Sequence, residues 1–149
     1  MRMRPRRRTP PEGERRAMRP LSSPRESFVD ARGEILNLLD VPFASAAVIT
    51  SVKGAVRANH YHKTDYHYCW LQRGGLIYAH RPVGQRRAPR QWVIKPGQLF
   101  YTPPMYEHVM IFTEDSVLFA FARNNRETAN YESDTVRVPP LIAKQTHSV

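Results

Sequence analysis

The sequence has a single cysteine, Cys69, among its 149 residues. One thiol excludes an internal disulfide framework and is typical of a protein from a reducing compartment. The sequence also lacks the apolar stretch of a secretory signal peptide, and it has no run of about eighteen apolar residues that would cross a membrane. These absences favour a cytoplasmic protein without membrane spans, in which Cys69 is a small core residue.

Acidic residues are scarce at the start of the chain, where basic charge is concentrated. Residues 1–25 contain nine arginines, five prolines and two glutamates, which gives +7 of the net charge of +10 and leaves +3 for the other 124 residues. Such a segment buries too little apolar surface to offset its ordering entropy. We therefore expect residues 1–25 to form a disordered basic tail.

Three functional interpretations compete with an inert tail. A basic arm can contact nucleic acid or an anionic surface, although no aromatic residues accompany the arginines for stacking on single strands. An arginine-rich, acid-poor start also resembles an organellar transit peptide, although the prolines disrupt an amphipathic helix. Translation can also begin downstream, at Met18. We favour an inert tail or a downstream start over contact with nucleic acid.

The body of the chain favours short β-strands separated by turns. Strands are expected at residues 46–52, 66–72, 76–80, 92–95, 99–102, 107–112 and 117–122. Gly74-Gly75 predicts a tight hairpin, and Pro96-Gly97 predicts a turn. Residues 27–40 form a lead-in with a turn at 30–33, and residues beyond 123 predict loop or short helix with one late strand around 135–138. The pattern predicts an all-β domain over residues 27–140, followed by a C-terminal tail at 141–149.

Four histidines fall at spacings typical of a metal site. His60 and His62 share one face of a strand, because successive side chains point to opposite faces. His67 follows a short polar break, and His108 comes later in the chain. Burying four imidazoles without an ion would leave ring nitrogens without partners. The spacing predicts that all four bind one divalent transition ion: iron, zinc, manganese, nickel or cobalt. The alternative is a barrel whose histidines bond to one another and to water.

Residues around these histidines fall at fixed offsets. The first stretch contains Gly54, His60, His62, His67 and Gly74, and the second contains Gly97, Pro103, Met105, His108 and Phe112. These stretches resemble the two motifs of the cupin superfamily, with His67 at the usual glutamate and with Met105 and Phe112 at the usual glycine and asparagine. The resemblance implies a cupin jelly-roll barrel, a double-stranded antiparallel β-helix. The replacements imply a more apolar cavity and an ion that keeps its full charge, and is therefore a stronger Lewis acid.

A second set of residues narrows the resemblance. The set is Asp30-x-Arg32-Gly33, His60-Tyr-His-Lys63, Pro104-Met105 and the apolar strand at 117–122. It resembles the cupin isomerases and epimerases that act on deoxythymidine-diphosphate keto-sugars. That resemblance implies that His60 or His62 removes a proton beside a ketone, without a metal. Members of that group do not typically have histidines matching both His67 and His108, which favours a metal-dependent variant here.

The leading functional hypothesis is an isomerase, epimerase or lyase that acts beside a carbonyl of a small molecule, such as a nucleotide-linked keto-sugar of carbohydrate or secondary metabolism. The ion would polarise the carbonyl and stabilise an enolate, with His60 and His62 as catalytic residues. Arg57 is a candidate for binding a phosphate, because its guanidinium binds two oxygens at once. Lys63, which could reach the cavity mouth, and Tyr66 are further candidates for substrate binding. Tyr66 is also a candidate acid or base, although strand alternation directs it away from the histidines.

Two other functions remain open from the sequence. The same histidines suit a mononuclear iron dioxygenase, in which oxygen and substrate occupy open positions on the metal. A ligand-binding or structural cupin without catalysis is the third hypothesis, with its basic tail reaching an anionic partner. Related barrels commonly pair, so a homodimer is expected. His80 and His147 match no motif and are predicted to lie on the surface.

Overall fold

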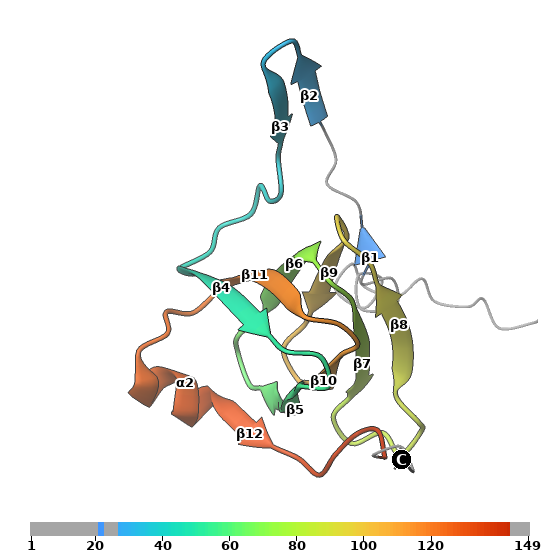
Figure 1. Ribbon diagram of the computed structural model, residues 1–149. Helices are drawn as coiled ribbons and strands as arrows, with labels where there is room; N and C mark the ends of the chain where they lie inside the picture. Colours follow the sequence, from blue (N-terminus) through green and yellow to red (C-terminus); the bar gives the residue numbers. More distant parts are fainter. Residues whose placement is uncertain (1–20, 23–26, 144–149) are drawn as a thin grey trace, which may run out of the picture.

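The computed structural model describes residues 21–22 and 27–143 (Figure 1). The predictions for most of the basic tail and for residues 144–149 lie outside this part of the chain, and so does His147. No helix among the described residues is long and apolar enough to span a membrane.

Two five-stranded sheets form the body, and their neighbouring strands are antiparallel. The first sheet consists of β1 (Leu21–Ser22), β9 (Leu99–Thr102), β6 (His67–Arg73), β11 (Ser116–Ala122) and β4 (Ser45–Ser51), in that spatial order. The second consists of β12 (Thr135–Arg137), β5 (Val56–His62), β10 (Tyr106–Phe112), β7 (Leu76–Pro82) and β8 (Arg90–Ile94). From β4 to β11 the chain crosses between the sheets at almost every step. This is the predicted all-β jelly roll, which the structure confirms.

Three further elements complete the described chain. A separate hairpin of β2 (Ser27–Asp30) and β3 (Gly33–Leu36) projects from the body (Figure 1). The helix α2 (Thr128–Asp134) leads directly into β12. The expected short helix and late strand near the C-terminus are therefore present. In the lead-in at 27–40, by contrast, the sequence predicted only a turn, and the two strands that flank this turn were not predicted.

Alternation along the strands builds the core. In β11 the residues Ser116, Leu118, Ala120 and Ala122 are buried, while the residues between them are only partly covered. This period of two is what a strand with one face toward a barrel interior requires. The core cluster comprises Cys69, Leu71, Leu76, Tyr78, Ile94, Phe100, Phe112, Leu118 and Ala120. The prediction of Cys69 as a core residue is confirmed, and burial raises the pKa of its thiol to about 12.

The predicted hairpin at Gly74-Gly75 is wrong. The strands on either side, β6 and β7, belong to different sheets, so the glycines form a crossing between sheets. A Cβ atom on Gly74 would lie 2.1 Å from Ser116 Oγ and 2.5 Å from the Asp115 carbonyl oxygen. Gly74 also has a φ of +98°. The glycine is needed for close approach of the chain and for this backbone conformation, not for a two-residue turn.

Inward-facing residues change from apolar to polar along the barrel. At one end Leu71 lies opposite Leu118, and Phe112 lies opposite Leu76. At the other end His67 lies opposite Thr102 in the first sheet, and His108 lies opposite His60 in the second. Since directly opposed residues of neighbouring strands share a face, the apolar core fills one end of the barrel and imidazoles line the other.

Candidate functional site

A row of three histidines crosses the second sheet. His108 on β10 lies directly opposite His60 on β5 and directly opposite His80 on β7. His62 follows two residues after His60 and therefore faces the same side of the sheet. The side chains of His60, His62 and His108 are 8%, 1% and 3% exposed, so this face is the barrel interior.

The imidazoles of His60, His62 and His108 converge. One ring nitrogen from each lies within 4.8 Å of the others. The ring centroids are 4.7 Å apart for His60 and His62, and 4.8 Å apart for His60 and His108. We call these residues the three-histidine group. The sequence thus identified residues that the fold brings together from two strands.

A β-bulge places His60 across from His108. His108 lies opposite His60, but the next residue, Val109, lies opposite Ala58, so Asn59 is the extra residue. Ala58 and Asn59 have φ values of 74° and 55°, in the left-handed region. The bulge is held by the C-terminal segment, because the Asn59 carbonyl oxygen accepts from the Val138 backbone N at 2.9 Å. Without the bulge, the alternation of β5 would direct His60 and His62 away from the interior.

In two of the three imidazoles, Nδ1 is the ring nitrogen that lies against a hydrogen-bond partner. His108 Nδ1 lies 2.9 Å from the Tyr106 carbonyl oxygen. A carbonyl only accepts, so Nδ1 has the proton and Nε2 has the lone pair. His62 Nε2 is buried and has no hydrogen-bond partner among the described residues. A buried ring nitrogen without a hydrogen-bond partner is uncommon, and it fits the role of a cation ligand.

The three imidazoles are neutral at neutral pH. Burial, followed by the proximity of His62 and His67, lowers the pKa of His60 to about 3. Burial, followed by the proximity of His67, lowers the pKa of His62 to about 4. The pKa of His108 is also well below its usual value, chiefly because of burial. Neutral rings keep the lone pairs that metal binding requires.

His67 lies beside the three-histidine group but is not part of it. Its ring centroid is 4.7 Å from that of His62, and its Nε2 lies 2.9 Å from Asp65 Oδ2. Asp65 is buried, and its Oδ1 accepts from the Asn124 backbone N. Burial alone would raise the pKa of Asp65, but the hydrogen bond from His67 and the neighbouring charges lower it overall. Asp65 was not predicted from the sequence, although its i, i+2 spacing from His67 was a signal that the two share a face.

The prediction that His80 lies on the surface is wrong. Its side chain is 3% exposed, and its Nδ1 lies 2.8 Å from the Tyr78 hydroxyl, which also lies 2.8 Å from Thr102 Oγ1. The ring packs edge-on against Trp92. Alternation from the apolar Leu76 and Tyr78 would have placed His80 inside. No motif match was needed for that conclusion.

The predicted substrate-binding residues lie outside the three-histidine group. The Arg57 guanidinium is exposed and donates to Ser51 Oγ and to the Thr50 carbonyl oxygen. Lys63 Nζ donates to the Ser133 carbonyl oxygen at 3.2 Å. The Tyr66 hydroxyl donates to the Pro42 carbonyl oxygen, and its ring packs on Tyr68, on the outer side of β6. Their hydrogen bonds are all with residues other than the histidines.

Two motif replacements have clear structural settings. Met105 has a φ of 59°, which explains why glycine suits this position, and its side chain is 46% exposed. Phe112 belongs to the apolar core, at the end of the barrel opposite the histidines. The expectation that these two replacements make the cavity more apolar is therefore wrong, because Met105 is exposed and Phe112 lies in the core, away from the histidines.

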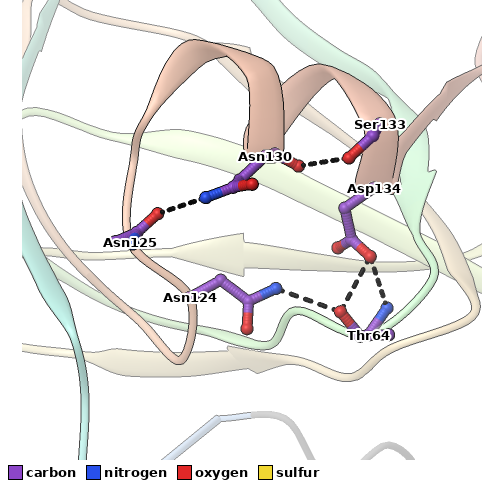
Figure 2. A pocket seen from close by; sticks show the side chains of 6 residues that line it. All are labelled: Thr64, Asn124, Asn125, Asn130, Ser133 and Asp134. Carbon is purple, nitrogen blue, oxygen red and sulfur yellow. Dashed lines mark hydrogen bonds between the residues drawn. The ribbon is translucent and has the colours of Figure 1, made fainter.

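A polar hollow of about 340 Å³ lies next to this end of the barrel (Figure 2). It is lined by Thr64, Asn124, Asn125, Asn130, Ser133 and Asp134. Asp134 accepts hydrogen bonds from the Thr64 backbone N and Oγ1, and from the Asp65 backbone N. These contacts fasten the end of α2 to the loop that contains Asp65, so the hollow marks the junction between α2 and the histidine end of the barrel.

No protein-family model matches the sequence, and no curated protein matches it. Solved structures do match. A sugar 3,4-ketoisomerase from Thermoanaerobacterium thermosaccharolyticum in complex with TDP is 21% identical with a TM-score of 0.63, and the match covers 78% of this chain and 87% of that one. A 3'-monoepimerase from Streptomyces bikiniensis in complex with dTDP-quinovose is 18% identical with a TM-score of 0.66, covering 81% and 69%.

A third similar structure is the dTDP-4-dehydrorhamnose 3,5-epimerase from Sulfolobus tokodaii, which is 19% identical with a TM-score of 0.61, covering 77% of this chain and 73% of that one. At these identities the likeness establishes the fold. The chain has the cupin fold, in the form found in isomerases and epimerases of deoxythymidine-diphosphate sugars. The resemblance inferred from the motif residues is confirmed at this level.

Proposed function

We propose that this protein is a cupin isomerase or epimerase that moves a proton at a carbon beside a carbonyl, on a nucleotide-linked keto-sugar. The observation that supports it is the three-histidine group, which faces the interior of a barrel whose fold is shared with such enzymes. The similar ketoisomerase was solved as a histidine-to-asparagine mutant in complex with TDP-4-keto-6-deoxyglucose. That compound is the substrate class we assign to this chain.

We further propose that His60, His62 and His108 hold a divalent transition ion. The residues fit such an ion, because they are neutral, His108 keeps the lone pair of Nε2, and His62 Nε2 is buried without a hydrogen-bond partner among the described residues. His67, predicted as a fourth ligand, would bind through Nδ1, since its Nε2 faces Asp65. A carboxylate behind an imidazole is the usual partner of a metal-binding histidine. When bound, the ion would supply Lewis-acid polarisation of the substrate carbonyl.

His60 and His62 are the proposed catalytic residues. A free base works best with a pKa near the operating pH, whereas burial and mutual proximity hold the pKa values of these rings at about 3 and about 4. This mismatch favours their action as ligands over their action as free bases. Their burial would also keep bulk water from a substrate bound against them. Arg57, Lys63 and Tyr66 remain proposed substrate contacts.

The reaction is tested with the full chain in deuterated water. Incubation with TDP-4-keto-6-deoxyglucose is expected to introduce solvent deuterium beside the carbonyl, measured by NMR of the sugar. His62→Asn is expected to reduce the exchange rate by at least about 100-fold, because it removes a proposed ligand of the ion that would polarise the carbonyl, an effect worth several kcal/mol. Gln72→Ala, an exposed change on β6, serves as the control. Absence of deuterium with the unmodified chain would contradict the proposed reaction.

The metal site is tested separately by elemental analysis of protein purified without added metal. One divalent transition ion per chain is expected, and the His60→Ala, His62→Ala double variant is expected to lose it. Equal metal contents in the two proteins would show that the three-histidine group is not the binding site.

An iron dioxygenase is the second candidate, favoured by one observation. Among the described residues, three donors lie mutually close, which leaves more positions open on an octahedral ion than the four ligands expected from the sequence. Oxygen consumption by the iron-loaded protein, without sugar isomerisation, would favour it. If neither activity is found, the ligand-binding barrel without catalysis remains.

Two chains are proposed to pair as a homodimer. The β2–β3 hairpin stands apart from the body (Figure 1), and its side chains Phe28, Val29 and Ile35 are 58%, 69% and 69% exposed. Apolar side chains on a projecting arm are typical of a surface that another chain covers. The cytoplasmic location, the limits of the domain at 27–140 and the inert basic tail remain predictions from the sequence.

A further inference from the structure

We infer that Thr135 is a positioning residue, which fixes the tautomer of His62 and thereby aims the His62 Nε2 lone pair into the three-histidine group. Thr135 begins β12 and lies directly opposite His62 on β5. Its hydroxyl oxygen is 2.6 Å from the Tyr131 carbonyl oxygen and 3.2 Å from His62 Nδ1. Both contacts involve the same hydroxyl group. The contact to which it donates its single proton therefore decides which ring nitrogen of His62 is protonated.

The proton of the Thr135 hydroxyl belongs to the shorter contact. A carbonyl oxygen has no proton to give, so the hydroxyl must donate to Tyr131. The hydroxyl can then only accept from His62, which requires a proton on Nδ1. A neutral imidazole has one N–H, so Nε2 of His62 has the lone pair. This is the nitrogen that is buried without a partner among the described residues.

The same arrangement occurs on the neighbouring strand. His108 donates through Nδ1 to the Tyr106 carbonyl oxygen and keeps its lone pair on Nε2. Two rings with different partners therefore keep the lone pair on the same nitrogen, Nε2, within a group whose ring nitrogens lie within 4.8 Å of one another. A hydrogen bond between two imidazoles requires an N–H on one ring and a lone pair on the other. Because both Nε2 atoms have a lone pair, the matched tautomers favour an electron-pair acceptor between the rings, such as a divalent transition cation.

The segment around Thr135 holds its hydroxyl in place. The Tyr131 backbone N donates to the Glu127 carbonyl oxygen at 2.9 Å, and the Lys63 backbone N donates to the Asp134 carbonyl oxygen at 2.9 Å. The Tyr131 ring also packs against His62, with centroids 5.7 Å apart. Thus α2 and the start of β12 act together as the support for His62. Only one part of the inference rests on the proposed function, namely that the lone pair of His62 Nε2 binds a metal ion.

The test measures the tautomer directly. Long-range proton–nitrogen NMR of the metal-free full chain, labelled with nitrogen-15 in histidine, distinguishes protonated from unprotonated ring nitrogens near pH 7. His62 is expected to have its proton on Nδ1. Thr135→Val, which keeps the shape and removes the hydroxyl, is expected to move the proton to Nε2 or to give a mixture. Thr135→Ser is expected to restore Nδ1–H, and Thr128→Val on the exposed start of α2 is expected to change nothing.

A second measurement is zinc affinity, obtained by competition with a chelator. Loss of a residue that orients a ligand typically weakens metal binding by about 10–100-fold, and that loss is expected for Thr135→Val but not for Thr135→Ser. A proton on Nε2 of His62 in the unmodified chain would overturn the inference, even if Thr135→Val does not fold. An unchanged tautomer in Thr135→Val would also overturn it. If the tautomers behave as expected but zinc does not bind, the positioning role stands and the proposed metal site fails.

Discussion

The histidines at the polar end of the barrel differ in which ring nitrogen is already engaged. His62, His80 and His108 each use Nδ1, toward Thr135, Tyr78 and the Tyr106 carbonyl oxygen respectively. His67 instead uses Nε2, toward Asp65. Each contact determines where the ring can still act, because a neutral imidazole has one donor and one acceptor nitrogen. Residue type alone therefore does not define the chemistry of this site.

The depressed pKa values predict a loss of stability in mild acid. In the unfolded chain a histidine has a pKa near 6.5, whereas folded His60 and His62 have values of about 3 and about 4. Between these limits the unfolded chain binds more protons, so the free energy of unfolding of the metal-free protein falls as the pH falls below 6.5. Each buried histidine contributes a slope of up to about 1.4 kcal/mol per pH unit. Urea unfolding from pH 7 to pH 5 measures it.

The control for this pH dependence is His60→Gln, which is expected to have a shallower slope. Asp65 does not interfere, because its pKa lies below 3.8 and its contribution is lost only at lower pH. The same slope in both proteins would show that His60 does not titrate on unfolding in this range.

The left-handed backbone conformation of Ala58 leads us to expect that glycine at this position stabilises the protein. A non-glycine residue at a φ of 74° is strained by about 1–2 kcal/mol, whereas glycine adds about 0.5–1 kcal/mol of unfolded-state entropy. Ala58→Gly is therefore expected to raise the free energy of unfolding by roughly 0.5–1 kcal/mol, measured by urea denaturation. Ala47→Gly, in the middle of β4, is the matched control and is expected to lower it. A loss of stability in both variants would show that the bulge is not strained.

At the scale of elements, the crossing between β6 and β7 depends on Gly74. Adding a Cβ there introduces a φ penalty and a clash with Ser116 and the Asp115 backbone. Gly74→Ala is expected to lower the free energy of unfolding by about 1.5–4 kcal/mol, from net backbone strain and overpacking together. Thermal or urea unfolding measures the change.

Gly84 supplies the matched control for Gly74. It has a φ of +85°, but nothing lies within 4 Å of its Cβ position. Gly84→Ala is therefore expected to cost only the net backbone term, about 0.5–1 kcal/mol after the unfolded-state entropy is included. Equal losses in the two variants would show that the clash with Ser116 relaxes without cost.

Strand positions were predictable where side-chain alternation is local. The strand expected at 99–102 matches β9, and the strands expected at 107–112 and 117–122 match β10 and β11 to within one residue. The partners of these strands were not predictable. Gly74-Gly75 has the composition of a hairpin turn but joins two sheets, because a turn dipeptide fixes only local backbone angles.

At the scale of the whole molecule, the β2–β3 hairpin predicts the oligomeric state. If a second chain covers it, the full-length protein has the mass of a dimer in solution. The Phe28→Ser, Ile35→Ser double variant is expected to be monomeric, because two exposed apolar side chains are removed from the contact. Size-exclusion chromatography with light scattering measures the mass.

Val52 provides the control for the hairpin, since it is also apolar and 70% exposed but lies on the body after β4. Val52→Ser is expected to leave the mass unchanged. A monomeric unmodified chain, or a dimer that persists in the double variant, would rule out pairing through the hairpin.

The sequence by itself determined that His60 and His62 face one way and that the body consists of short strands, because both properties follow from the period of two along a strand. Tertiary structure decided the rest. The register of β10 brought His108 and the unexpected His80 into one row. A contact across 73 positions placed the Thr135 hydroxyl on His62. Such pairings depend on strand register and on a one-residue bulge, which local patterns do not encode.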